Sequence, residues 1–321
     1  MSTRSSVGRR LIARVARRTG QARDAGARPP RRSIALAVGL LATLSPGFAP
    51  PARAAATVDV LYAGSLVNLM ERSVGPAFDK ASGDHFQGYA GGSKLLANQI
   101  KGKLRRADVF VSAVPSVNQS LMGAANGDWV SWYISFAQSP LVIGYSPNSK
   151  FAADFKSKPW YEVLEEPGIR IGRTDPKLDP KGALTLALMS KAEAFYKSAG
   201  LAQRVLGAPD NPAQVLPEEE LVGRLQSGQL DVGFFYSTET SEAKIPAITL
   251  PPQITPKAVY TVTILQGAPD PQGAERFVAY LLGTQGRDLM KQHGLALETP
   301  TLVGSAAAVP PGVRSLAAPA K

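Results

Sequence analysis

Three turns in this sequence combine small residues with groups that can hydrogen-bond an anion. Gly64-Ser65 and Gly92-Ser93 each precede apolar residues at helical spacing, and Asp179-Pro180-Lys181-Gly182 precedes a third such pattern. Backbone N–H groups in the first turn of a helix have no partner within that helix, and this end of the helix dipole is positive. A site built from several helix N-termini attracts anions. The three turns therefore indicate anion binding through neutral donors.

Each of these positions also has a structural explanation that needs no ligand. Serine is a preferred residue at helix N-caps, so Ser65 and Ser93 suit their turns in any case. Asp179 before Pro180 makes a strong helix start, and a carboxylate there would repel a dianion at close range. For Asp179, a cap and a ligand contact both stay open. Glu218 begins a run of three glutamates, which indicates a solvated first turn of a helix.

Catalysis by the two serines is not expected. A nucleophilic serine needs a neighbouring base, and no motif places a histidine or lysine beside Ser65 or Ser93. The Gly-x-Ser-x-Gly pattern of hydrolases is missing as well. The sequence has no cysteine, and its two histidines, His85 and His293, are expected at the surface, so zinc has few of its usual ligands. We predict a binding protein with no catalytic residue, no protein-held metal and no cofactor.

Strands that alternate with helices must position the three turns. Residues 58–63, 107–113 and 231–236 are short apolar stretches that indicate buried strands, and residues 141–145 and 169–172 indicate two more. Helical spacing follows several of these stretches. Such alternation predicts an α/β fold with mostly parallel sheets, in which ligands bind where the carboxyl ends of strands lead into helices.

The positive charge of the chain is confined to its first residues. The formal net charge is +11, but residues 1–55 hold eleven arginines and one aspartate, so the rest of the chain is nearly neutral. A protein that binds nucleic acid would need clustered Lys and Arg in its folded part. We therefore expect no nucleic-acid partner.

The N-terminal segment has the features of an export signal. Arginines precede an apolar stretch at residues 34–48, and small residues follow it, so cleavage is expected near Ala54 or Ala56 and residues 1–56 form a leader with a disordered extension. A membrane-spanning helix would need about twenty apolar residues, and Pro46 interrupts this shorter stretch, so a permanent anchor is the weaker alternative. Without cysteine, the chain has no site for a lipid anchor. These features predict a periplasmic protein.

Two blocks of the sequence resemble the periplasmic molybdate- and tungstate-binding proteins, which are solute-binding proteins of ABC transporters. The first block is Ala63-Gly64-Ser65-Leu66, and the second runs from Gly92-Ser93-Lys94-Leu95 through Gln99-Ile100 to residues 107–113. Weaker matches lie at residues 172–176, 179–182 and 231–236, so the resemblance spans residues 58–302. It implies a two-lobed periplasmic binding protein fold with a ligand cleft between the lobes.

The resemblance also implies lobe boundaries and a set of ligand contacts. The first lobe would comprise residues 57–138 and 247–302, the second residues 139–246, and the Ala-, Pro- and Gly-rich residues 303–321 would form a disordered tail. Ser65 and Ser93 would each supply a hydroxyl and a backbone N–H. In the second lobe, Lys181 would act through its backbone N–H, Glu218 would touch the ligand by its main chain, and Tyr236 would donate its phenol.

The ligand implied by the resemblance is molybdate or tungstate, and the implied protein partners are ABC permease subunits, with the chain itself a monomer. Archaeal-type tungstate binders carry two carboxylates at the ligand; Asp179 matches the first, and Phe235 stands where the second would be. The sequence does not choose between the two metals or set the coordination number of the bound metal. Sulfate, phosphate or a small organic anion is the alternative ligand.

Overall fold

The computed structural model describes residues 55–320, so the predicted leader lies outside the described residues apart from Ala55 and Ala56. Neighbouring strands follow the order β2-β1-β3-β9-β4-β7-β5-β6. The strands are β1 (Thr57–Ala63), β2 (His85–Gly91), β3 (Val109–Ser112), β4 (Trp132–Tyr145), β5 (Ile171–Thr174), β6 (Val215–Leu216), β7 (Val232–Tyr236), β8 (Ala247–Thr249), β9 (Lys257–Ile264), β10 (Ala296–Gly304) and β11 (Ala318–Pro319). Among residues 55–320, no helix is long and apolar enough to cross a membrane.

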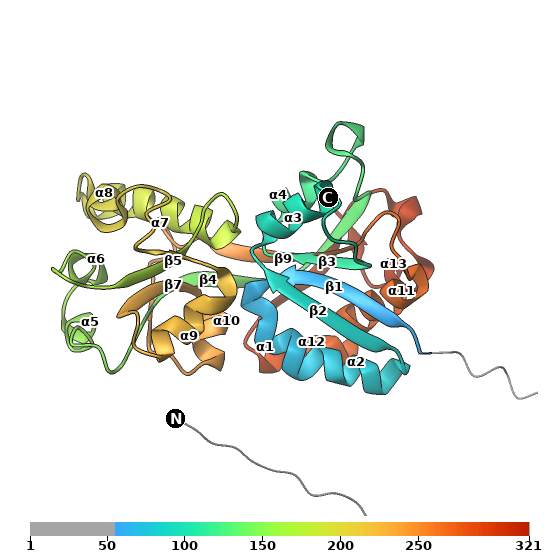
Figure 1. Ribbon diagram of the computed structural model, residues 1–321, viewed down its shortest axis with the longest axis horizontal. Helices are drawn as coiled ribbons and strands as arrows, with labels where there is room; N and C mark the ends of the chain where they lie inside the picture. The colour runs from blue at the N-terminus through green and yellow to red at the C-terminus, as the bar shows by residue number, and fades with distance from the viewer. Residues whose placement is uncertain (1–54, 321) are drawn as a thin grey trace, which may run out of the picture. The chain divides into compact units, whose positions relative to one another are not determined.

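Strand β4 connects two lobes. Up to Pro140 it pairs with β9 and β10, and from Leu141 onward it pairs with β7 and β8. We call β1, β2, β3, β9, β10, β11 and the earlier part of β4 the first lobe, and β5 to β8 with the later part of β4 the second lobe (Figure 1). Within β4, the sequence analysis predicted a strand only for residues 141–145. The earlier part lacks clear alternation because most of its side chains are buried on both faces.

Helices flank the strands of each lobe (Figure 1). The first-lobe helices are α1 (Val67–Leu69), α2 (Gly75–Ser82), α3 (Ser93–Lys101), α4 (Pro115–Gln119), α11 (Pro271–Leu282), α12 (Thr284–Gln292) and α13 (Pro311–Arg314). The second-lobe helices are α5 (Asp154–Ser157), α6 (Trp160–Val163), α7 (Pro180–Tyr196), α8 (Leu201–Leu206), α9 (Leu221–Gln226) and α10 (Ser237–Glu242). The 3-10 turns are η1 (Gly64–Leu66), η3 (Ala124–Asn126), η4 (Glu218–Glu220) and η5 (Ala306–Ala308), and η2 (Met70–Val74) is a π-helical segment between α1 and α2.

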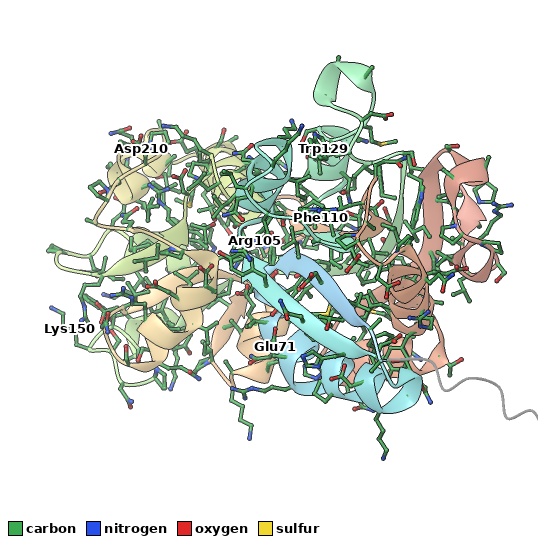
Figure 2. All side chains as sticks on the ribbon, turned by 45° about the vertical axis from the view of Figure 1, so that its right-hand side comes forward. Glu71, Arg105, Phe110, Trp129, Lys150 and Asp210 are labelled. Carbon is green, nitrogen blue, oxygen red and sulfur yellow. The ribbon has the colours of Figure 1, made fainter. Side chains whose placement is uncertain are left out.

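The two faces of the first-lobe sheet carry separate hydrophobic cores, because side chains alternate along a strand. Val60 and Tyr62 of β1 pack in the larger core with residues of α1 and α2, whereas Leu61 packs against α3 and α4. Phe110 belongs to this smaller core, and Figure 2 shows it inside the first lobe, far from Lys150 and Asp210 of the second. The sheet is therefore covered on both sides, as an α/β fold requires.

The segment after residue 302 corrects the prediction of a disordered tail. β10 continues to Gly304, η5 and α13 follow, and β11 pairs with β10 in parallel. Val309 and Val313 are the reason, because both side chains are almost completely buried against the first lobe. A few buried apolar side chains, together with the pairing of β11 with β10, thus order a stretch whose composition indicated disorder.

The position at which the chain passes back from the second lobe to the first also lies later in the sequence than expected. β8 was assigned to the first lobe, but its three residues pair with Val142, Ile143 and Gly144 of β4 in the second lobe. The chain rejoins the first-lobe sheet only at Lys257, which pairs with Pro140. A strand of three residues offers too little sequence pattern to assign it to either sheet.

Candidate functional site

The two Gly-Ser turns lie side by side at one edge of the first-lobe sheet. Strands β1 and β2 are parallel neighbours with Ala63 opposite Gly91, so the turns that follow them leave the sheet together. Ser65 lies in η1 and is 6% exposed, and Ser93 begins α3 and is fully buried. Neither serine side chain makes an N-cap hydrogen bond, because Ala63 and Gly92 occupy the cap positions.

Each serine oxygen is held by a donor from the first lobe. Tyr260 donates its O–H to Ser65 Oγ at 3.1 Å, and the backbone N–H of Ala113 donates to Ser93 Oγ at 3.1 Å. A hydroxyl that accepts one hydrogen bond still has its own hydrogen to donate. Both hydroxyls therefore keep their own hydrogen for a further acceptor. The role of Tyr260 could not be inferred from the sequence, because it lies 195 positions from Ser65.

Asp179 is the N-cap of α7. Its Oδ1 accepts hydrogen bonds from the N–H of Lys181 at 2.9 Å and from the hydroxyl of Thr174 at 2.7 Å. Its Oδ2 is buried and has no hydrogen-bond partner among the described residues. The prediction that Asp179 is a helix cap therefore accounts for Oδ1 but not for Oδ2. It also means that the N–H of Lys181, which was expected to meet the ligand, is engaged by Asp179 in this structure.

The side chain of Lys181 is the buried cation of the site. Its Nζ lies 2.8 Å from Glu239 Oε1, 3.3 Å from Glu218 Oε1 and 5.1 Å from the centre of the Tyr236 ring. Burial by itself would lower the pKa of Lys181, but the carboxylates of Glu239, Glu218 and Asp179 together raise it above its usual value. Lys181 therefore stays charged and attracts anionic groups from within the second lobe.

Glu239 was not singled out by the sequence analysis. Its second oxygen accepts the backbone N–H of Tyr236 at 2.7 Å, at the start of α10. Glu239 follows Tyr236 by three positions, which is the spacing at which an acidic side chain reaches back to the first residue of a helix. That spacing was the available signal. One carboxylate thus positions both Lys181 and Tyr236.

Tyr236 and Glu218 bring polar groups into the buried region between the lobes. The Tyr236 hydroxyl has no hydrogen-bond partner among residues 55–320, and burial, followed by the charge of Asp179, raises its pKa well above the usual value. It therefore remains a donor. Glu218 is 3% exposed, which corrects the prediction of a solvated first turn, whereas Glu219 and Glu220 are exposed. The reason is the first lobe: a methyl group on Gly64 would lie 3.0 Å from Glu218 Oε2.

Phe235 faces away from these groups. Adjacent residues of a strand point to opposite sides, so Tyr236 packs in the core that contains Tyr260 whereas Phe235 packs against Leu221, Leu225 and Ile245. Phe235 therefore adds no polar group to the site. Among the described residues, Glu218 and Asp179 are the carboxyl groups of the second lobe with buried oxygens that lack a hydrogen-bond partner.

The lobes touch where α3 meets the loop before α7. The N–H of Leu95 donates to the carbonyl of Leu178 at 2.8 Å, and Lys94 Nζ donates to the carbonyl of Pro176 at 2.7 Å. Two pockets flank this contact. One of about 330 Å³ is lined by Gly64, Ser65, Glu218 and Glu239, and the other, of about 260 Å³, by Gly92, Asp179 and Glu218. Glu218 lines both pockets, so it stands between them.

His293 also joins the lobes, and this corrects its assignment as an ordinary surface residue. Its Nε2 lies 2.8 Å from Ser73 Oγ, and its Nδ1 contacts Glu242 of α10. The order Ser-His-Glu resembles a hydrolase relay, but such an enzyme also needs free N–H groups to hold an oxyanion. Ser73 lies inside the continuous helical stretch from α1 to α2, where the N–H groups bond within the helix. We assign these contacts a structural role.

Comparison with known proteins identifies the family of this chain. A family model for bacterial extracellular solute-binding proteins matches residues 58–296. A solute-binding protein of Petrotoga mobilis is 31% identical over 238 residues, covering 64% of this chain and 72% of that protein. A molybdate/tungstate-binding protein of Thermococcus kodakarensis is 26% identical over 279 residues, covering 72% of this chain and 77% of that protein.

Solved structures share the fold. The periplasmic molybdate-binding protein of Azotobacter vinelandii superposes with a TM-score of 0.59 at 19% identity, covering 75% of this chain and 99% of that one. The sulfate-binding protein SubI of Mycobacterium tuberculosis superposes with a TM-score of 0.56 at 17% identity, covering 81% and 89%. These neighbours have the two-lobed fold of periplasmic binding proteins. The chain therefore belongs to the bacterial extracellular solute-binding protein family.

Proposed function

We propose that this protein captures a tetrahedral oxyanion of the molybdate or tungstate kind and delivers it to an ABC importer. The observation that carries the proposal is the set of buried hydroxyls at the cleft. Ser65 and Ser93 are each held by another donor so that they can donate in turn, and the Tyr236 hydroxyl has no partner among the described residues. The names of the relatives from Thermococcus kodakarensis and Pyrococcus abyssi support the choice of anion.

In this proposal the anion is held by neutral donors. Each O–H or N–H places a partial positive charge against an oxygen, and exclusion of water strengthens every such bond. Ser65 and Ser93 donate from the first lobe and Tyr236 from the second, while Lys181 supplies a positive charge behind Tyr236. Asp179 orders the start of α7, and Glu218 closes the site against Gly64. The bound anion is released unchanged, so the protein performs no reaction.

The same proposal fixes the cellular setting. The protein acts as a monomer in the periplasm, after removal of residues 1–56, and presents its closed form to the permease subunits. From the strand pairing we take the first lobe as residues 57–140 and 257–320 and the second lobe as residues 141–256. Closure around β4 and its neighbours then buries the anion.

Calorimetry with four anions tests the proposed function. We expect molybdate or tungstate to bind at least about a hundredfold more tightly than sulfate or phosphate, which corresponds to about 2.7 kcal/mol. The reason is size, since the metal oxyanions have longer bonds to oxygen and fill a larger cavity. Equal affinity for all four anions, or no heat with either metal oxyanion, contradicts the proposal.

The serines provide a second test. Ser65→Ala and Ser93→Ala should each weaken oxyanion binding by about 1.5 to 3 kcal/mol, the usual contribution of a hydrogen bond to a charged group. Each change also leaves Tyr260 or the Ala113 N–H without an acceptor, so unfolding by urea should show a loss of about 1 kcal/mol or more.

The matched control for the serines is Ser149→Ala in the second lobe. It removes a hydroxyl that donates to Asp231 at 2.8 Å, at the opposite end of β7 from Tyr236. Ser149→Ala should therefore lower stability without changing affinity. If Ser65→Ala and Ser93→Ala behave like this control, the two hydroxyls stabilise the fold and do not contact the anion.

A further inference from the structure

The region between the lobes holds more negative than positive groups. Asp179, Glu218 and Glu239 are each at most 5% exposed, and Lys181 is the cation they surround. The phenols of Tyr236 and Tyr260 face the same carboxylates. The pocket of about 330 Å³ that Glu218 and Glu239 line is also lined by Arg72, Lys244, Glu219 and Glu242. Three ionised carboxylates with one ammonium would leave a buried excess of negative charge before any dianion arrived, which is strongly unfavourable.

Glu218 accepts the fewest hydrogen bonds of the three carboxylates. Glu239 accepts hydrogen bonds from Lys181 at 2.8 Å and from the Tyr236 N–H at 2.7 Å, and Asp179 accepts two on its Oδ1. Neither oxygen of Glu218 has a hydrogen-bond partner among the described residues, although Lys181 Nζ lies 3.3 Å from Oε1. Burial, followed by the charges of Asp179 and Glu239, raises the pKa of Glu218, and Lys181 only partly opposes this.

The burial of Glu218 depends on closure. The residue belongs to η4 of the second lobe, and its side chain packs against Gly64 in the first-lobe turn that carries Ser65. Separation of the lobes would therefore expose Glu218 to water, where a glutamate has a pKa of about 4.3 and is ionised at neutral pH. Closing the lobes transfers the same group into a site that disfavours its charge.

We propose that closure over the oxyanion takes up one proton, which Glu218 holds, and that its carboxylic acid then donates a hydrogen bond to an anion oxygen. The proton comes from solvent, and no covalent bond of the anion changes. A carboxylic acid kept neutral in a dry site is an effective donor. This inference rests on the proposed function, and it makes Glu218 a ligand through its side chain, in addition to the main-chain contact implied by resemblance.

The proposal sets the direction of the pH dependence. Glu218 has a raised pKa in the closed complex, so its contribution to affinity is complete below the pKa of the open form and is lost as pH rises toward that of the closed form. Between these two values the affinity should fall about tenfold for each pH unit. From pH 6.5 to pH 8.5 we therefore expect the affinity to fall, with a slope of at most about tenfold for each pH unit.

The test is calorimetry with sodium molybdate and sodium tungstate in two buffers of different ionisation enthalpy, Tris and HEPES, at the same pH. The wild-type protein should take up about one proton per anion, following the linkage relation. Glu218→Gln keeps a donor but cannot titrate, so its proton uptake should be near zero and its affinity should change less than about twofold over the same pH range. The control Glu219→Gln, at an exposed neighbouring position, should behave like wild type.

The outcomes separate the inference from the proposed function. Wild-type binding without proton uptake overturns the inference alone, as does Glu218→Gln that still takes up a proton. Absence of binding of both metal oxyanions to the wild-type protein overturns the proposed function, and the inference falls with it. If Glu218→Gln does not fold, infrared difference spectra of the wild-type protein decide the matter, because the carbonyl band of a protonated carboxylic acid should appear when the anion is added and its absence contradicts the proposal.

Discussion

A Gly92→Ala substitution should weaken oxyanion binding by about a hundredfold, or about 2.7 kcal/mol, without destabilising either lobe. A methyl group at this position would lie 2.7 Å from the carbonyl oxygen of Leu178 and 3.1 Å from Asp179 Cβ, both in the second lobe. A carbonyl oxygen of the backbone cannot move aside as a flexible side chain would. The neighbouring hydrogen bond from the N–H of Leu95 to the carbonyl of Leu178, at 2.8 Å, holds the two backbones close together at this contact. The methyl group therefore keeps the lobes apart.

The backbone conformation of Gly92 allows this substitution to test closure without straining the first lobe. Its φ of −57° and ψ of 127° are accessible to alanine, so the substitution introduces no strain within the first lobe. Calorimetry would measure the loss of affinity, and small-angle X-ray scattering would show whether the anion still compacts the protein. Gly223→Ala is the control, because a methyl group there meets nothing within 4 Å. An affinity within about tenfold of wild type would mean that binding does not require this contact.

Lys181→Met should lower the free energy of unfolding by about 3 to 5 kcal/mol at pH 7, the usual effect of removing one partner from a buried ion pair. Methionine has a similar volume, so the loss reflects charge: Glu239 and Glu218 would stay buried without their cation. Urea unfolding would measure it. Lys177→Met is the control, because its side chain is 71% exposed and pairs with Asp210 at the surface. The control should change stability by less than about 0.5 kcal/mol.

The pH dependence of this variant follows from the same charges. Burial raises the pKa values of Glu218 and Glu239 in the folded protein, and removal of Lys181 would raise them further. Carboxyl groups with raised pKa values destabilise the fold at pH values above their unfolded pKa of about 4.3, so the defect of Lys181→Met should shrink as pH falls toward 4. Adding Glu239→Gln should restore part of the stability at pH 7. A variant as stable as wild type at pH 7 would contradict the buried-charge argument.

Local signals in the sequence located the turns from which the candidate site is built. The Gly-Ser turns after two apolar stretches placed Ser65 and Ser93, and the Asp-Pro start of α7 placed Asp179, because a strand end, a helix start and a cap depend on residues a few positions apart. The α/β alternation likewise followed from apolar periodicity. What the sequence alone determined about this protein was therefore its layer pattern, its family and the turns that carry Ser65, Ser93 and Asp179.

Only the tertiary structure decided how those groups work together, because their contacts join residues far apart in the chain. Tyr260 reaches Ser65 across 195 positions, Glu239 reaches Lys181 across 58, and Gly64 buries Glu218 from the other lobe. Glu218, Glu219 and Glu220 are equivalent in sequence, yet one is buried and two are exposed. The local pattern assigns all three to a solvated helix start. Burial between two lobes is a property of their closure, and it raises the pKa of Glu218 in a way that no nearby residue indicates.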